Sequence, residues 1–202
     1  MIMEKYYRLI DELNSGEIIR EEDGAWYIFS YGTDEWVPTL LMLRYTSSED
    51  GLYKLYEEVP EDKALQLLDE RHDNLCEMEK MAKTLFDSMS SAEQKDKAEA
   101  ILPQLPHFEG RITAYLSAVC ARGEISPQDF LSLGFSKRIV NSLEILNPID
   151  LSVDNKLLAK QDSNAWHIIY AKMNLELDEI AKDTSRQGRK KFRLFEEKIL
   201  NW

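Results

Sequence analysis

The sequence changes character at Pro60, and this change limits the possible folds more than any other feature. Before it, short runs rich in aromatic and β-branched residues alternate with turn residues, whereas after it apolar residues recur at the three- and four-residue steps of helices. We therefore expect an α+β protein, with a small α+β unit over 1–59 followed by an all-helical domain over 60–202. A chain of 202 residues is long enough for both.

The N-terminal unit is expected to contain a β-hairpin. Asp23-Gly24 has the composition of a tight turn, and the flanking runs 17–20 and 25–30 have the composition of paired strands. The run 36–45 fits either a strand or a helix, because its periodicity does not decide between them. The run 52–56 could form a further strand.

The residues ahead of the hairpin predict an amphipathic helix. Tyr6, Leu9, Ile10 and Leu13 recur at helical spacing, so that they would share one face. The turn-forming sequence Asn14-Ser15-Gly16 would end this helix.

The residues after Pro60 predict a series of helices. Proline followed by Glu61 and Asp62 suits a helix N-terminus. Ser91, with Gln94 three residues later, has the pattern of a capping box, and Ser136 is expected to cap a later helix. The expected helices cover 60–89, a segment that begins after Ser91, 110–121, a short stretch in 126–134, 138–146, 151–160, 163–182 and 186–201.

The net charge of −12 is unevenly distributed along the chain. Residues 1–70 hold 17 Asp and Glu against 6 Lys and Arg, whereas the remaining 132 residues are close to neutral. An acidic front end repels phosphate backbones, so we expect no nucleic-acid partner, although it could dock a basic protein. The alternative is that these acidic residues keep a small unit soluble.

Three features bear on where the protein works. Cys76 and Cys120 offer no disulfide framework and suit a reducing compartment, so we expect a cytoplasmic protein. The longest strongly apolar, uncharged stretch, 36–43, is far shorter than the roughly 20 residues of a membrane helix. The charged, amphipathic start of the chain is unlike a secretory signal. We expect no membrane partner.

Motifs that carry chemistry are scarce. His72-Asp73 has the composition of a metal-binding pair, but no histidine precedes it, so a surface histidine on a long helix is the favoured interpretation. His107 and His167 are 60 residues apart and belong to no metal-binding motif. Cys120 lies in an apolar run and is expected to be a core thiol. The sequence has no glycine-rich phosphate loop.

The C-terminal run 186–195 carries five basic residues with Phe192 and Phe195 between them. Three interpretations stay open: a patch that binds anions, the solvated face of an amphipathic helix, or a surface that pairs with the acidic N-terminal unit.

Several stretches of the second half match, in order, the motifs of one family. They are Gln94-Lys95-Asp96-Lys97-Ala98, the helix 114–122, Ile125-Ser126-Pro127-Gln128-Asp129-Phe130-Leu131 with Leu133-Gly134-Phe135, the helix 139–147, and Ala171-Lys172-Met173. Over residues 81–202 the chain thereby resembles the HD-domain hydrolases of guanosine polyphosphates, the hydrolase half of the RelA/SpoT proteins. The resemblance implies a helical HD-like fold.

The positions that would carry catalysis in this family are substituted. The resemblance assigns the first metal-binding histidine of the family to Ser91, a later histidine to Leu105, and the His-Asp pair to Ser117 and Ala118. The acidic pair of the water-orienting motif falls on Ala121-Arg122, the late metal-binding Asp on Leu175 and a following Asn on Glu179. Lys97 is retained and, in the family, lies near the bound nucleotide. We therefore expect no catalytic residue, no metal ligand and no cofactor, and Lys97 as a ligand-binding residue.

These observations favour a catalytically inactive HD-like protein that binds a protein partner or a small nucleotide. The alternative is a metal-dependent phosphohydrolase of nucleotides with a rearranged site built from His72, Asp73, His107 or His167.

The N-terminal unit is expected to carry the specific interaction, because it combines 13 acidic residues against 5 basic ones with many aromatic rings. These rings are Trp26, Tyr27, Phe29, Trp36, Tyr53 and Tyr56. The competing interpretation is that the rings fill the small core of this unit.

Overall fold

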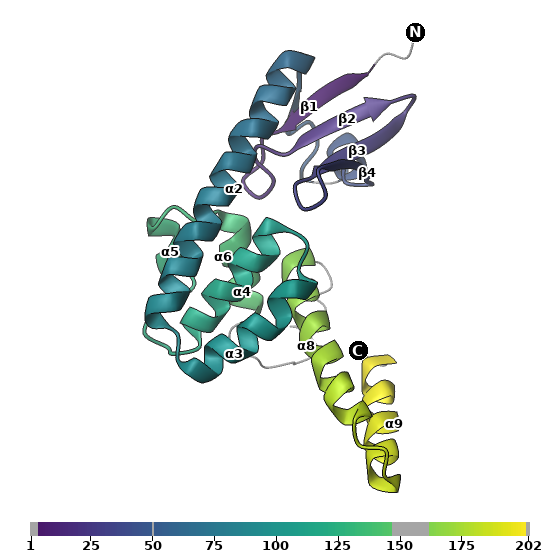
Figure 1. Ribbon diagram of the computed structural model, residues 1–202. Helices are drawn as coiled ribbons and strands as arrows, with labels where there is room; N and C mark the ends of the chain where they lie inside the picture. The colour runs from purple at the N-terminus through teal and green to yellow at the C-terminus, as the bar shows by residue number, and fades with distance from the viewer. Residues whose placement is uncertain (1–3, 50, 147–161, 201–202) are drawn as a thin grey trace. The chain divides into compact units, whose positions relative to one another are not determined.

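The computed structural model describes residues 4–49, 51–146 and 162–200, and it divides into two compact units, Met1–Lys80 and Met81–Trp202 (Figure 1). The first unit contains a β-sheet and the second is helical, which confirms the α+β class. Helix α2 (Glu61–Met89) contributes residues to both units. The sequence had assigned the whole of this helix to the second.

The first unit is built on a five-stranded antiparallel sheet in the order β4-β3-β2-β1-β5. Its strands are β1 (Lys5–Leu9), β2 (Ile18–Glu22), β3 (Ala25–Ser30), β4 (Glu35–Pro38) and β5 (Tyr56–Val59). The expected hairpin is β2 and β3, joined by Asp23 and Gly24. Both turn residues have positive φ, which is the geometry that an Asp-Gly pair favours.

Apolar side chains cover both faces of this sheet. On one face Tyr6 and Ile18 pack with Ala64 and Leu68 of α2, which runs beside the sheet (Figure 1). On the other face a cluster around Tyr7 includes two residues of the short helix α1 (Met42–Thr46). The unit therefore places the sheet between two helical layers.

The predicted amphipathic helix around Tyr6–Leu13 is wrong, because its first half is strand β1. Tyr6, Tyr7 and Leu9 are all buried, as expected for a strand that is covered on both faces. Ile10 and Leu13, the other half of the proposed helical face, are exposed. Over so few residues the helical spacing was coincidental.

The two ambiguous segments of the first unit are also settled. The run 36–45 contains both elements: β4 ends at Pro38, as suits an edge strand, and α1 follows. The run 52–56 is mostly a turn, with Lys54 at positive φ, so β5 begins four residues later than expected, at Tyr56.

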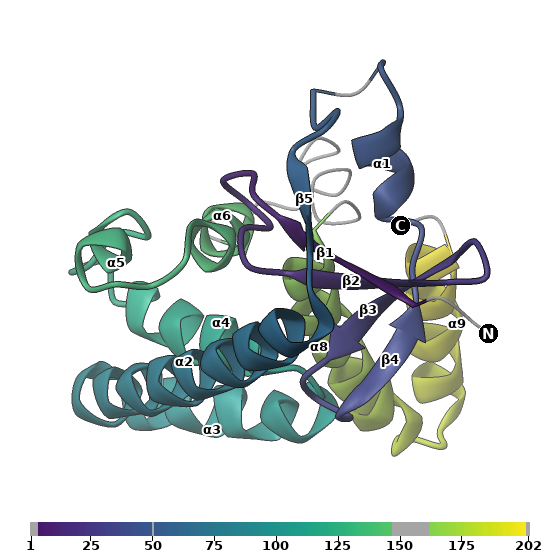
Figure 2. The same ribbon diagram turned by 90° about the horizontal axis from the view of Figure 1, so that it is seen from above.

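The second unit is a group of helices around α4. Its elements are the end of α2, α3 (Ala92–Ile101), a 3₁₀ turn η1 (Leu102–Gln104), α4 (Phe108–Cys120), α5 (Asp129–Ser132), α6 (Lys137–Leu146), α8 (Ser163–Ala181) and α9 (Arg186–Leu200). These bounds confirm the expected helices apart from 151–160, which lies outside the described residues. Helix α4 packs against α3, α6 and α8, as Figure 2 shows from above.

The ends of these helices follow the cap residues in the sequence. The side-chain oxygen of Ser91 accepts a hydrogen bond from the backbone N–H of Gln94 at 3.3 Å, and the Gln94 side chain accepts one from the Ser91 N–H at 2.9 Å. The predicted capping box is thus confirmed. Ser136 caps α6 by accepting from the N–H of Ile139 at 3.3 Å.

Candidate functional site

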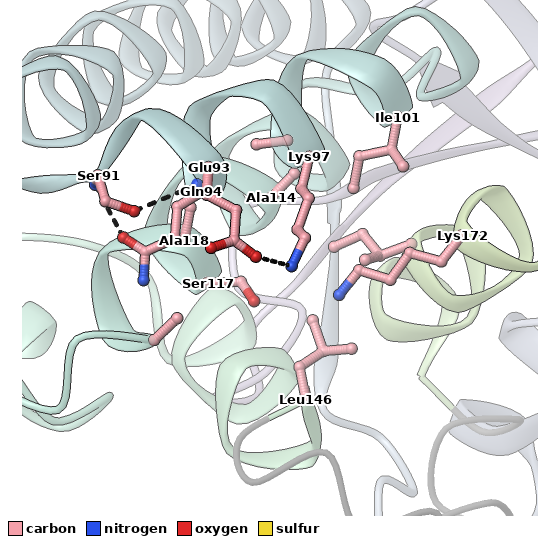
Figure 3. A pocket seen from close by; sticks show the side chains of 13 residues that line it. Ser91, Glu93, Gln94, Lys97, Ile101, Ala114, Ser117, Ala118, Leu146 and Lys172 are labelled. Carbon is pink, nitrogen blue, oxygen red and sulfur yellow. Dashed lines mark hydrogen bonds and ion pairs between the residues drawn. The ribbon is translucent and has the colours of Figure 1, made fainter. Parts of the chain in front are cut away.

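A cavity of about 320 Å³ lies within the helical unit (Figure 3). Its walls come from α3, α4, α6 and α8, four elements that are distant in sequence but packed together. The lining residues are Ser91, Glu93, Gln94, Lys97, Ala98, Ile101, Ala114, Ser117, Ala118, Ala121, Leu146, Ile168 and Lys172. This volume lies at the lower end of the range of small-molecule sites.

One wall of the cavity is polar and comes from the first turns of α3. The Lys97 ammonium lies 2.5 Å from Oε1 of Glu93, one helical turn earlier, and both side chains are largely exposed. This contact lowers the pKa of Glu93, since the ammonium stabilises the carboxylate. An anion that bound to Lys97 would therefore have to compete with Glu93.

A second lysine faces Lys97 across the cavity. Lys172 extends from α8 so that its Nζ approaches the Lys97 ammonium (Figure 3). The side chain keeps surface accessible to solvent, but protein atoms of the cavity wall surround its charge. Burial, and after it the positive charge of Lys97, lowers the pKa of Lys172. Two ammonium groups from different helices thus face the same cavity.

The rest of the cavity is lined by small and apolar side chains. Ile101, Ala114 and Ile168 belong to a buried cluster that forms its floor. Leu105 is part of the same cluster, and Leu175 packs against it. These two positions, where the family resemblance implies a histidine and a metal-binding Asp, thus hold apolar residues that pack in or against this cluster.

Ser91, Lys97, Ser117 and Ala118, to which the family resemblance assigns places at the functional site, all line this cavity. Ala121 lines it as well.

The residues at two other positions of the family motifs make their contacts outside the cavity. Arg122 donates hydrogen bonds to the carbonyl oxygen of Met89 at 2.7 Å and to Glu124 at 2.9 Å. Glu179 pairs with Lys182 on the surface. Neither residue lines the cavity.

The structure brings two of the three histidines together. The rings of His107, which precedes α4, and His167 in α8 have centroids 6.0 Å apart. Burial, and then the neighbouring His167, lowers the pKa of His107. Neither histidine lines the cavity.

The His72-Asp73 pair lies in the first unit. His72 is half-buried near the ring of Tyr31, with 6.5 Å between the centroids, and its Nδ1 is 3.9 Å from Asp73 Oδ1. Within residues 4–49, 51–146 and 162–200 no three His, Cys, Asp or Glu side chains are grouped so that they could hold a metal ion.

Cys120 is buried in α4, as predicted for a core thiol. Burial raises the pKa of its thiol to about 11. A thiol with so high a pKa is a poor nucleophile at neutral pH.

The aromatic rings of the first unit are mostly explained by packing. Trp26, Tyr27, Phe29, Trp36 and Tyr56 are half-buried. Four of them join the clusters on the two sheet faces, and Arg20 lies over the ring of Tyr27 at 5.2 Å. Tyr53 is 42% exposed. The rings therefore give little support to a binding surface in this unit.

Reasoning from the sequence did not single out Lys172 as a residue of the candidate site. It lies 75 positions after Lys97, and nothing in the local pattern of α8 separates it from a solvated lysine. The signal that could have found it is its place in Ala171-Lys172-Met173, one of the stretches similar to the hydrolase family.

The chain matches no protein-family model, and comparison with curated proteins and with solved structures gives no significant match. The helices of the described residues include none with the length and apolar character needed to span a membrane.

The cavity offers charged, polar and apolar groups to a ligand. Lys97 and Lys172 offer ammonium groups, Ser117 and Gln94 offer polar groups, and the floor is apolar. Among the described lining residues Glu93 carries the one carboxylate, and it is paired with Lys97. General acid–base catalysis or metal ligation would need further groups at this place.

Proposed function

We propose that this protein is a catalytically inactive HD-like module that binds a small anionic ligand in the cavity between α3 and α8. The observation that carries the proposal is the convergence of Lys97 and Lys172 in one cavity with Ser117 and Ala118. In the family that the sequence resembles, the last two positions hold the His-Asp pair. The site thus has the cations for an anion, while Ser and Ala stand where the metal ligands would be.

Phosphate is the favoured anionic group. Two ammonium groups from different helices can each donate to oxygens of one phosphoryl group, and such charge-assisted hydrogen bonds are stronger than neutral ones. A bound phosphate would compensate Lys172, whose pKa is lowered by burial and by Lys97. A guanosine polyphosphate or a similar small nucleotide is the first candidate, since the family resemblance points to this class.

The affinity of the purified protein for guanosine tetraphosphate tests this proposal. We expect binding by titration calorimetry, and a loss of about tenfold or more in K97Q or K172Q, because each removes a charged hydrogen-bond donor. K83Q is the matched control: Lys83 is an exposed helical lysine paired with Asp87 at 2.6 Å, outside the cavity. Guanosine, which lacks phosphates, should bind weakly. Equal binding by K97Q, K172Q and K83Q would reject the proposal.

The rival function is a metal-dependent phosphohydrolase with a rearranged site. The approach of His107 and His167 is the observation in its favour. This function requires divalent metal in the purified protein, together with activity that is lost when His167 is replaced. The inactive module requires neither.

We also propose that the protein works in the cytoplasm. Cys76 and Cys120 are both free, as suits a reducing compartment.

A further inference from the structure

Helix α9 carries a stripe of positive charge. Arg186, Arg189, Lys190 and Arg193 follow the spacing i, i+3, i+4, i+7, so that they share one side of the helix, and all four are exposed. The ion pairs between described side chains, which in α9 end at Phe195, include none of these four residues. We call these four residues the basic stripe.

The opposite side of α9 is occupied by packing within the same unit. Gly188 and Phe195 are buried, Phe192 is half-buried, and α9 packs against α8. A Cβ added at Gly188 would overlap the backbone of Asp183, so the close approach of α9 to the preceding turn depends on this glycine. Among the described side chains of α9, Leu194 is 57% exposed, so the apolar residues of this helix are covered only in part.

A complementary stripe lies on the first part of α2. Asp62, Asp69, Asp73 and Glu77 have the spacing i, i+7, i+11, i+15, which places them on one exposed side of that helix, away from the buried Ala64 and Leu68. We call these four residues the acidic stripe.

The two stripes are opposite in sign, and the two units differ in net charge as well. Residues 1–80 contain 20 acidic and 8 basic residues, whereas residues 81–202 contain 17 of each. Contact between two N-terminal units is therefore opposed by charge, and contact of α9 with an N-terminal unit is favoured.

We infer that the basic stripe on α9 docks on the acidic stripe of α2 in a second copy of this chain. Two different surfaces meet in this contact, so it is head-to-tail and produces rings or open chains of molecules. A nucleic acid is the less suitable occupant of the basic stripe, because the net charge of −12 repels a polyanion.

Sedimentation velocity over a range of protein concentrations tests the inference. We expect association at low ionic strength that disappears as salt is raised, since exposed charges are screened. The double charge reversals R189E/R193E and D69K/D73K should each weaken association by about tenfold or more, because each converts attraction into repulsion at two positions. K83E is the control for a surface charge outside both stripes, and circular dichroism verifies that each variant is folded.

The decisive sample is an equimolar mixture of the two reversed variants. In this mixture the acidic α9 of one variant meets the basic α2 of the other, so association should return although each variant alone is monomeric. A wild-type protein that stays monomeric at low salt overturns the inference. It is equally overturned if the mixture remains monomeric, or if K83E weakens association as much as the stripe reversals do.

Discussion

In the free protein the two lysines of the cavity repel each other, and a bound anion would relieve this unfavourable interaction. Lys172 places its charge among protein atoms and near Lys97, and both effects lower its pKa from the ordinary value of 10.5. At neutral pH this arrangement costs stability that an anionic ligand can restore. Under the proposed function, the residues that would bind the ligand are therefore also a source of instability in the free protein.

Replacing Lys97 should raise the pKa of Lys172. In the wild-type protein the unfolded chain binds more protons than the folded one between the lowered pKa and 10.5, so stability rises with pH through this window. K97Q removes the repulsion and should flatten that dependence. NMR titration of the Lys172 side-chain resonances measures the pKa directly. K83Q should leave it unchanged, and an unchanged pKa in K97Q would contradict the account.

The two cysteines should differ sharply in reactivity. Burial raises the pKa of Cys120 to about 11, so its thiolate is scarce at pH 8 and is also shielded. Cys76 is only half-buried. A chromogenic thiol reagent should label C120S rapidly and C76S very slowly until a denaturant is added. Rapid labelling of native C76S would show that Cys120 is reachable and could take part in chemistry.

At the scale of helices and strands, Ser91 stabilises the start of a helix. The family resemblance assigns a metal-binding histidine to this position, and here the hydroxyl caps α3 instead. We expect S91A to destabilise the helical unit by about 1 kcal/mol, the usual effect of losing such a cap. Urea unfolding measures this, with S132A, an exposed serine in α5, as the control. A neutral S91A would mean that the capping box adds nothing.

The sequence predicted the helical elements better than the first strand. Capping residues such as Ser91 and Ser136 act within one turn, so their signal is local and survives in the folded protein. The helix predicted from Tyr6 to Leu13 failed because the burial of β1 depends on α1 and α2, which follow it in the chain. Contacts with elements so far along the chain cannot be detected from the eight residues 6–13 alone.

For the same reason, only some of the residues that line the cavity could be predicted from the sequence. Lys97 and Ser91 stand close together in the sequence and in the structure. Lys172 reaches the cavity through the packing of α8 on α3 and α4, which no local pattern indicates.

For the whole molecule, the account predicts independence from divalent metals. An ion that bound the native state alone would raise the melting temperature by linkage, and its removal would lower it. We expect a chelator to leave the melting temperature of the purified protein unchanged. A fall of several degrees would reveal a bound ion. If the chelator caused no such fall in H167Q, the ion would be located at the His107–His167 pair.

The most direct test of the central claim follows binding and hydrolysis in one sample. Guanosine tetraphosphate is incubated with the full chain and manganese, and the protein-bound and free fractions are then analysed for intact nucleotide and pyrophosphate. The account predicts that the wild-type protein retains intact nucleotide, that K97Q and K172Q retain much less, and that pyrophosphate stays at the level of the blank. Pyrophosphate release that a chelator abolishes, or a wild-type protein that retains no nucleotide, would contradict it.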